Sequence, residues 1–180
     1  MHLQNPLTRS AAVSRLRLAL ALWAIAGLAA CASAEIQPVA SPQVFIVRHA
    51  EKVSGPDPEL SVAGKARALA LAELLDDAGI TRIFSTDTRR TRSTAAPLAQ
   101  QLGLEIEIYD HREQRALGER IRASGETMLV VGHSNTIGTL AAKFGIAPGK
   151  PIDEATEYDR LYVITLAGNE VRGEVRRYGD

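Results

Sequence analysis

The chain has 180 residues, which is enough for one domain of ordinary size but not comfortably for two. Its 21 Lys and Arg residues balance its 21 Asp and Glu residues, so the formal net charge is zero. Proteins that bind nucleic acid usually carry a basic excess, so this balance argues against a nucleic-acid partner. Hydrophobic residues make up 46% of the sequence, which is normal for a globular protein.

The N-terminal segment has the pattern of an export signal. Arg9, Arg15 and Arg17 precede an uncharged apolar run over residues 18–30. A positive segment followed by such a run is typical of a secretory leader, and the run is too short to favour a membrane-spanning helix. We therefore expect an exported protein, either periplasmic or anchored to the membrane as a lipoprotein.

Two processing sites compete at the end of this leader. Residues 28–31, Leu-Ala-Ala-Cys, resemble a bacterial lipobox, in which Cys31 would become the lipidated first residue. Residues 32–34, Ala-Ser-Ala, offer a small-x-small cleavage site instead, and a retained anchor helix is the third alternative. The lipoprotein interpretation is preferred. It divides the chain into a leader (1–34), a short tether (35–42) and one domain (43–180), with membrane contact only through the lipid anchor.

Cys31 is the only cysteine in the sequence. The mature domain therefore has no internal disulfide and no thiol nucleophile, although its expected compartment permits disulfides. Its stability has to come from its core.

Apolar strand patterns alternate with helical patterns along residues 43–180. We expect strands over residues 44–47, 80–85, 104–109 and 128–132, helices over 62–78, 88–102, 113–123 and 134–142, and a hairpin of 161–166 with 170–177. Ser61 is the expected N-cap of the first helix, and Gly79 is expected to end it. This order predicts an α/β fold, a three-layer α/β/α sandwich with a mostly parallel central sheet and an antiparallel edge strand.

Two histidines directly follow wholly apolar strands. His49 comes after residues 44–47 and Arg48, and His133 comes after residues 128–132. Ligands bind at the carboxyl ends of parallel strands, so on neighbouring strands the two side chains would share one pocket. Histidine can attack phosphorus, and an arginine fork can hold two phosphate oxygens. Either histidine alone is more often structural, but the pair indicates a site for phosphoryl chemistry.

Three arginines open the helix predicted over residues 88–102. Arg89, Arg90 and Arg92 lie in its first turns, where the positive end of the helix dipole repels them. An anion docked at this helix N-terminus would relieve the conflict. We expect Arg90 to face the pocket, while Arg89 and Arg92 are solvated.

Three stretches resemble the signatures of the histidine phosphatase superfamily, in the branch of phosphoglycerate mutases and small bacterial phosphohistidine phosphatases. They are residues 47–51 (VRHAE), 90–95 (RTRSTA) and 131–135 (VGHSN). The resemblance implies a phosphoglycerate mutase-like fold. It also implies that His49 is the nucleophile that becomes phosphorylated and that Arg48, Arg90 and His133 complete the phosphate pocket. Ala50 departs from the glycine usual at its position.

The expected chemistry places conditions on the site. His49 must be neutral to attack, so a backbone carbonyl or similar acceptor should hold its second nitrogen. A protonated His133 would add a third cationic donor beside the arginines. No cluster has metal-ligand spacing, so neither a metal nor another cofactor is expected.

The proton donor is the weakest part of the resemblance. Related enzymes usually place a carboxylate after the third strand, where this sequence offers Asp110 and Glu113, neither of them in a recognisable motif. Glu51 is expected in an ion pair. Residues 157–159 are expected to form a structural turn.

The preferred function is an exported phosphatase that hydrolyses small phosphate monoesters through a phosphohistidine intermediate. The alternatives are a phosphohistidine-protein phosphatase, a phosphoglycerate mutase-like phosphoryl transferase and, less favoured, a non-catalytic anchored phosphate-binding module. The sequence indicates neither the physiological substrate nor the oligomeric state.

Overall fold

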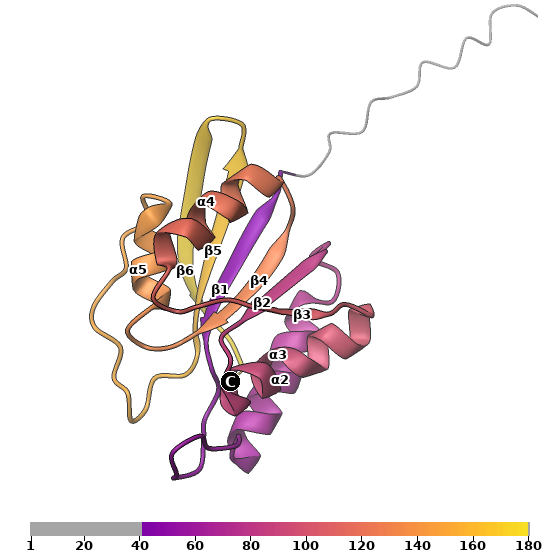
Figure 1. The fold of residues 1–180 in the computed structure, drawn as a ribbon, viewed down its shortest axis with the longest axis vertical. Coiled ribbons are helices and arrows are strands. Elements are labelled where there is room, and N and C mark those ends of the chain that lie inside the picture. Colours follow the sequence, from indigo (N-terminus) through magenta and orange to yellow (C-terminus); the bar gives the residue numbers. More distant parts are fainter. Residues whose placement is uncertain (1–40, 180) are drawn as a thin grey trace, which may run out of the picture. The chain divides into compact units, whose positions relative to one another are not determined.

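The computed structural model describes residues 41–179, so the predicted leader, Cys31 and most of the predicted tether lie outside the described residues. The described part begins with β1 (Gln43–Arg48), α2 (Val62–Leu75), β2 (Arg82–Ser85), α3 (Arg89–Leu102) and β3 (Ile106–Ile108), and continues with α4 (Gln114–Ser124), β4 (Met128–Gly132), α5 (Ile137–Lys143), β5 (Arg160–Ala167) and β6 (Glu170–Arg177) (Figure 1). No helix in this part is long and apolar enough to cross a membrane.

The strands form one six-stranded sheet in the order β3-β2-β4-β1-β5-β6. The four strands from β3 to β1 pair in parallel, whereas β5 pairs antiparallel with β1 and β6 antiparallel with β5. The predicted α/β fold with a mostly parallel sheet is therefore confirmed. The predicted hairpin supplies two strands, β5 and β6, and of these two β6 lies at an edge of the sheet.

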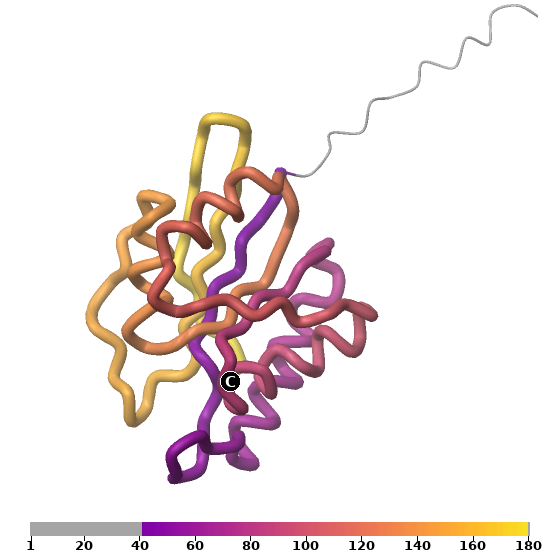
Figure 2. The backbone as a smooth tube through the Cα atoms, in the orientation of Figure 1, coloured from indigo at the N-terminus to yellow at the C-terminus, as the bar shows by residue number. Residues whose placement is uncertain are grey.

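Side chains of the central strands alternate between two hydrophobic cores. On one face Phe45 and Val47 of β1 pack with α2 and α3, and on the other face Val44 and Ile46 pack with α4 and α5. Successive residues of a strand point to opposite faces, so an unbroken apolar strand needs helices on both sides. This arrangement gives the three predicted layers. Figure 2 traces the path of the backbone through them.

The helix ends follow local capping with small shifts from the prediction. Ser61 caps α2 as predicted, because its Oγ accepts a hydrogen bond from the Gly64 amide at 3.1 Å. The helix ends at Leu75 rather than Ala78, since the Ala78 amide donates to the Leu75 carbonyl in a tighter turn. Gly79 then follows with φ of 69°. The third strand is also shorter than predicted and covers only residues 106–108.

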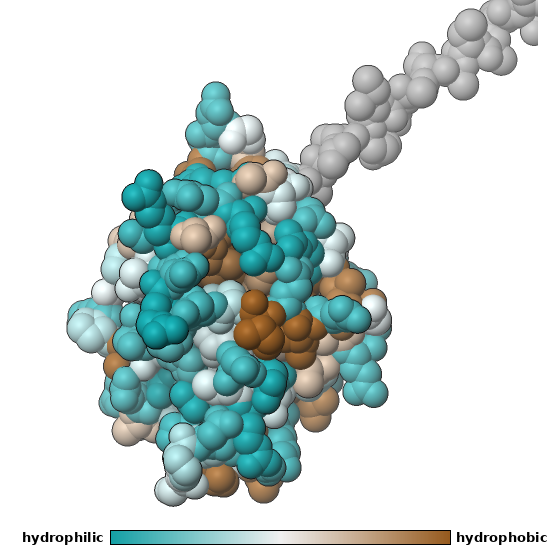
Figure 3. Space-filling model, in the orientation of Figure 1, coloured by the Kyte–Doolittle hydropathy of each residue, from teal (hydrophilic) through white to brown (hydrophobic). Residues whose placement is uncertain are grey.

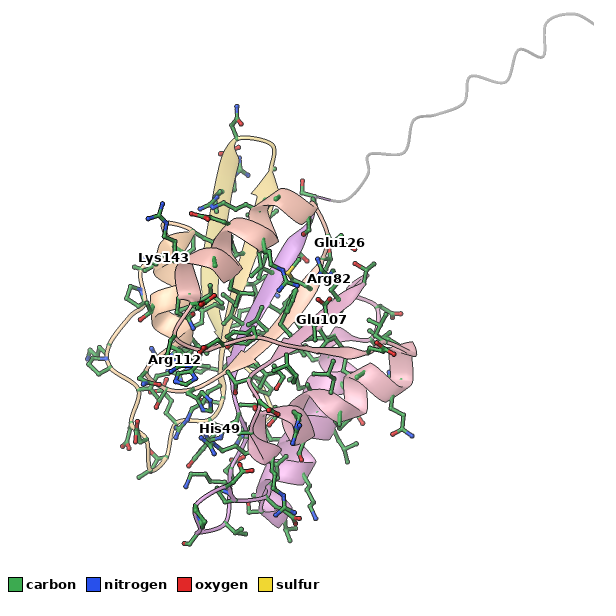
Figure 4. The ribbon with its side chains drawn as sticks, in the orientation of Figure 1. His49, Arg82, Glu107, Arg112, Glu126 and Lys143 are labelled. Atoms are coloured by element: carbon green, nitrogen blue, oxygen red, sulfur yellow. The ribbon has the colours of Figure 1, made fainter. Side chains whose placement is uncertain are left out.

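The surface shown in Figure 3 is mostly hydrophilic, with an apolar patch near β3. Ile108 of that strand is half-exposed. A charged network joins Arg82 to Glu107 at 2.7 Å and to Glu126 at 3.3 Å, well separated from His49 in Figure 4. This network therefore stabilises another part of the sheet and does not belong to the site described next.

Candidate active site

The register between β1 and β4 brings the two predicted histidines together. Arg48 pairs with Gly132, so His49 and His133 leave the sheet side by side. The His49 amide donates to the Gly132 carbonyl at 2.9 Å, and the two ring centroids are 5.6 Å apart. Gly132 has no room for a larger residue, because a Cβ there would lie 2.9 Å from the Tyr109 hydroxyl.

Both rings line a cavity of about 370 Å³ at this end of the sheet. Its wall is formed by Arg48, His49, Lys52, Thr88, Arg90, His111, His133, Ser134, Asn135 and Glu154. All four residues predicted for phosphoryl chemistry are therefore in one cavity, and most of the charged groups around them are cationic.

The hydrogen bond of His49 defines its tautomer. Its Nδ1 lies 2.8 Å from the Ala50 carbonyl oxygen, which can only accept, so Nδ1 carries the proton and Nε2 keeps the lone pair. Burial, together with the charges of Arg48 and Arg90, lowers the pKa of His49 to about 3 despite that hydrogen bond. The ring is thus neutral near pH 7, as a nucleophile requires.

His133 is held between Arg90 and a threonine. Its Nδ1 lies 3.4 Å from Arg90 Nη2, which can only donate, so Nε2 carries the proton and donates to Thr86 Oγ1 at 2.9 Å. Burial and then the Arg90 charge lower the pKa of His133 to about 4. Burial and the neighbouring guanidinium thus favour the neutral ring, so His133 does not add the third cationic donor that a protonated ring would supply.

Arg48 holds the segment that follows α5 as well as facing the cavity. Its Nη1 donates to the Glu157 carbonyl at 2.8 Å and its Nη2 to the Glu154 carbonyl at 3.0 Å, while its guanidinium carbon lies 4.1 Å from the centroid of the Tyr158 ring. Both Nη atoms of the guanidinium group therefore already donate to carbonyl oxygens, which limits how many N–H groups of Arg48 can bind phosphate.

Arg48 and Arg90 each retain an unused donor. Among the described residues, the buried Nε atoms of both side chains have no hydrogen-bond partner. A buried N–H without a partner costs about 1–3 kcal/mol, so an acceptor in the cavity would be favourable at both. These two N–H groups support an anion-binding pocket.

The other two arginines of α3 point away from this cavity. Arg89 pairs with Glu59, and Arg92 pairs with Asp87 at 2.7 Å, with both guanidinium groups about half exposed. Asp57 accepts a hydrogen bond from the Arg89 amide at 3.1 Å. Asp57 also lies 3.7 Å from Arg90 Nη1, so carboxylates of this chain partly relieve the conflict of all three arginines with the helix dipole.

Part of the chain that forms this cavity matches the model of a known protein family. Residues 44–120 match the model of the histidine phosphatase superfamily, branch 1. This segment is similar to the histidine phosphatase superfamily. It contains Arg48, His49 and Arg90, and the sheet register brings His133 from beyond its end into the same cavity.

The alignment to curated relatives covers only part of each protein. The "Probable phosphoglycerate mutase GpmB" of Escherichia coli O1:K1 / APEC is 38% identical over 78 residues, which is 39% of this chain and 36% of the relative. A GpmB from Shigella boydii serotype 18 matches with the same values. The chain therefore spans about a third of the length of these relatives.

Solved structures extend the likeness of fold over most of the chain. A structure of the protein histidine phosphatase SixA complexed with tungstate has a TM-score of 0.60 at 19% identity, covering 76% of this chain and 95% of that one. A mycobacterial glucosyl-3-phosphoglycerate phosphatase has a TM-score of 0.58 at 16% identity, covering 77% and 99%. At this identity the two structures establish the histidine phosphatase fold for this chain.

Threonines complete the candidate site and were missed as functional residues. Thr94 Oγ1 accepts from the Ala50 amide at 3.0 Å and donates to the Arg90 carbonyl at 2.8 Å, so it links the His49 loop to α3. Thr86 orients His133. Both lie in or beside the motif around Arg90, which was the available signal, but hydroxyl groups at a helix start are usually read as caps.

The predicted carboxylate donors do not line the cavity. Asp110 is paired with Arg112 at 2.7 Å, and this hydrogen bond lowers the pKa of the Asp110 carboxyl to about 2. Glu113 is exposed just before α4. Glu154, which sequence reasoning did not consider, lines the cavity instead and accepts from Ser134 Oγ at 2.6 Å.

The expected ion pair of Glu51 is present, with Arg67 at 2.9 Å. The turn expected at residues 157–159 lies instead at 154–156, and Glu157 follows it and pairs with Arg160 at 2.6 Å. In residues 41–179 no group of three or more His, Cys, Asp or Glu side chains could hold a metal ion.

Proposed function

We propose that this chain is a phosphatase that hydrolyses phosphate monoesters through a covalent phosphohistidine on His49. One observation carries the proposal. The Ala50 carbonyl fixes the His49 proton on Nδ1, and Nε2 keeps its lone pair in a cavity where Arg48 and Arg90 have unused buried N–H donors. A neutral nucleophile beside guanidinium donors is the arrangement that phosphoryl transfer requires.

The reaction has two displacements at phosphorus. In the first, His49 Nε2 bonds to phosphorus while the bond to the ester oxygen breaks and its electron pair leaves on that oxygen. In the second, water attacks phosphorus, the N–P bond breaks and its electron pair returns to His49. The Nε–H groups of Arg48 and Arg90 would donate to the non-bridging oxygens, on which negative charge lies throughout.

A phosphohistidine-protein phosphatase is the second candidate. The location of Asp110 and Glu113 outside the cavity lining favours it, because imidazole leaves phosphorus more easily than an alkoxide does. The fold also resembles that of SixA, which is described as a protein histidine phosphatase, over 95% of the SixA chain. A phosphoglycerate mutase-like transfer is named by the curated relatives, of which only 36% is covered.

The test is hydrolysis by the purified full-length protein of a panel of phosphate monoesters and of a phosphohistidine peptide. We expect release of inorganic phosphate from the esters, inhibition by vanadate, which mimics the five-coordinate transition state, and no loss on dialysis against EDTA. Hydrolysis of the peptide alone would favour the second candidate. Activity that EDTA removes and one divalent metal restores would contradict the mechanism.

We also propose that the protein is exported as a lipoprotein, on the basis of the charged and apolar segments before Cys31. If Cys31 is acylated, Cys31→Ser should move the protein from the membrane fraction to the soluble fraction or leave the precursor unprocessed. Fractionation and N-terminal sequencing would check this. An unchanged distribution with an N-terminus at Glu35 would indicate ordinary signal cleavage.

A further inference from the structure

A third imidazole lines the cavity beside the two predicted from the sequence. His111 lies in the segment between β3 and α4, and its ring centroid is 6.0 Å from that of His133 at an interplanar angle of 81°. His133 therefore contacts His49 on one side and His111 on the other. The mechanism described so far gives His111 no part.

The surroundings of His111 orient its ring. Its Nδ1 lies 3.8 Å from Asp110 Oδ1, so the opposite nitrogen, Nε2, is on the edge turned away from Asp110. Its backbone carbonyl accepts from Gln114 Nε2 at 2.6 Å, which holds this turn against α4. Among the described residues no side-chain hydrogen bond occupies either ring nitrogen, and 52% of the side chain is exposed. The ring can therefore exchange protons with solvent and with a bound molecule.

Asp110 is suited to support His111 and not to donate a proton itself. Arg112 binds the carboxylate through two nitrogens, Nη2 at 2.7 Å and Nε at 3.0 Å. This pairing keeps the pKa of Asp110 near 2, so the carboxyl is ionised near neutral pH and cannot act as an acid. Asp110 therefore provides a fixed negative charge 3.8 Å from His111 Nδ1.

The other acidic groups near the cavity fit the donor role less well. Glu154 lines the wall, but its Oε1 is held by a hydrogen bond from Ser134 Oγ at 2.6 Å. Glu113 is exposed and absent from the cavity lining. His133 is held by Arg90 and Thr86. Of the imidazoles in the wall, only His111 has a carboxylate beside its ring and about half of its side chain exposed.

We propose that His111 protonates the leaving group, with Asp110 as its positioning residue. This inference rests on the proposed function. As the ester P–O bond breaks and Nε2 of His49 bonds to phosphorus, the His111 imidazolium gives its proton to the departing oxygen, so that an alcohol leaves. In the second displacement neutral His111 takes a proton from the attacking water, which restores the imidazolium as the phosphate forms.

This assignment predicts the substrate class. Without a proton donor, a site of this kind is restricted to esters of acidic alcohols and to phosphoramidates. With His111 as donor, the substrates are phosphate esters of ordinary alcohols, including sugar and glycerol phosphates, whose alkoxides are poor leaving groups.

The experiment compares two esters that differ in leaving group. For the full-length protein, kcat/KM is measured on glycerol 2-phosphate and on p-nitrophenyl phosphate, since this constant reports the steps through the first P–O cleavage. His111→Ala and His111→Gln are expected to lose about 10²–10³-fold on glycerol 2-phosphate. On p-nitrophenyl phosphate, whose leaving group needs no proton, both should stay within about threefold of wild type.

Further variants distinguish the residue that positions the His111 ring from the residue that transfers the proton. Asp110→Asn should show the same selectivity with a smaller loss and should add nothing in the His111→Gln background, because it acts through that ring. Arg115→Ala is the matched control, as Arg115 lies just beyond this turn and pairs with Glu119 at 2.9 Å on the exposed side of α4. It should leave both constants unchanged.

Equal losses on the two esters in the His111 variants would overturn the inference and give His111 a binding role. Selective loss in Glu154→Gln or Glu113→Gln, with the His111 variants unaffected, would overturn it in favour of a carboxylate donor. A wild-type protein that hydrolyses neither ester would instead overturn the proposed function and this inference with it. The two failures are thus distinguishable.

Discussion

His49→Ala is expected to reduce phosphatase activity to background, a loss on the order of 10⁴–10⁶-fold, because the proposed covalent intermediate forms on His49 Nε2. Mass spectrometry of acid-sensitive phosphopeptides, quenched under alkaline conditions, should find one phosphoryl group on His49 of the wild type and none on the variant. His133→Ala is the matched comparison. It should retain the phosphoryl group on His49 while turning over slowly.

The fold of His49→Ala should remain intact, since the ring faces a cavity and not either hydrophobic core. Urea unfolding followed by circular dichroism would check this. Robust turnover by a folded His49→Ala protein, or a phosphoryl group on another residue, would refute the phosphohistidine mechanism.

The lowered pKa of His49 adds a pH dependence to this comparison. The folded ring titrates near 3, whereas an unfolded histidine titrates near its ordinary value of 6.5. Between these values the unfolded chain binds more protons, so wild-type stability should fall as the pH drops below 6.5. His49→Ala removes this contribution, and its unfolding midpoint should change less between pH 7 and pH 5. An equal change in both proteins would mean that His49 is charged in the fold.

Arg90→Ala is expected to lower kcat/KM by about 10²–10³-fold, because it removes donors to charge that is stabilised in the transition state. Arg90 is the α3 arginine whose side chain lines the cavity, with Nη2 at 3.4 Å from His133 and a buried Nε without a partner among the described residues. Arg90→Lys should restore little, because lysine lacks the planar fork.

Arg89 and Arg92 provide controls on the same helix turn. Each forms a half-exposed ion pair outside the cavity, with Glu59 and Asp87 respectively, and exposed pairs contribute little. Arg89→Ala and Arg92→Ala should each stay within about tenfold of wild type in a steady-state assay. If Arg89→Ala were the most damaging of the three, the phosphate would lie on the other side of α3.

The sequence by itself determined the architecture and the central residues of the site. The apolar runs of β1 and β4 allow no solvent-exposed face, so they had to lie in the middle of a sheet with helices on both sides. Because each run ends in a histidine, the parallel register then places His49 and His133 together. The strands follow from local periodicity and the site residues from the resemblance of three motifs, whereas the pairing of β1 with β4 is a feature of the fold.

Only the tertiary structure decided how the site is completed. Carbonyl groups of residues 154 and 157 occupy the Nη atoms of Arg48, and Asp57 from the loop before α2 lies against α3. The turn after β3 also directs His111, and not Asp110, into the cavity wall. Such contacts join residues far apart in the chain and depend on how loops pack. Loop packing leaves no periodic pattern, so the sequence offered Asp110 and Glu113 as proton donors, and only the fold showed that His111 lines the cavity.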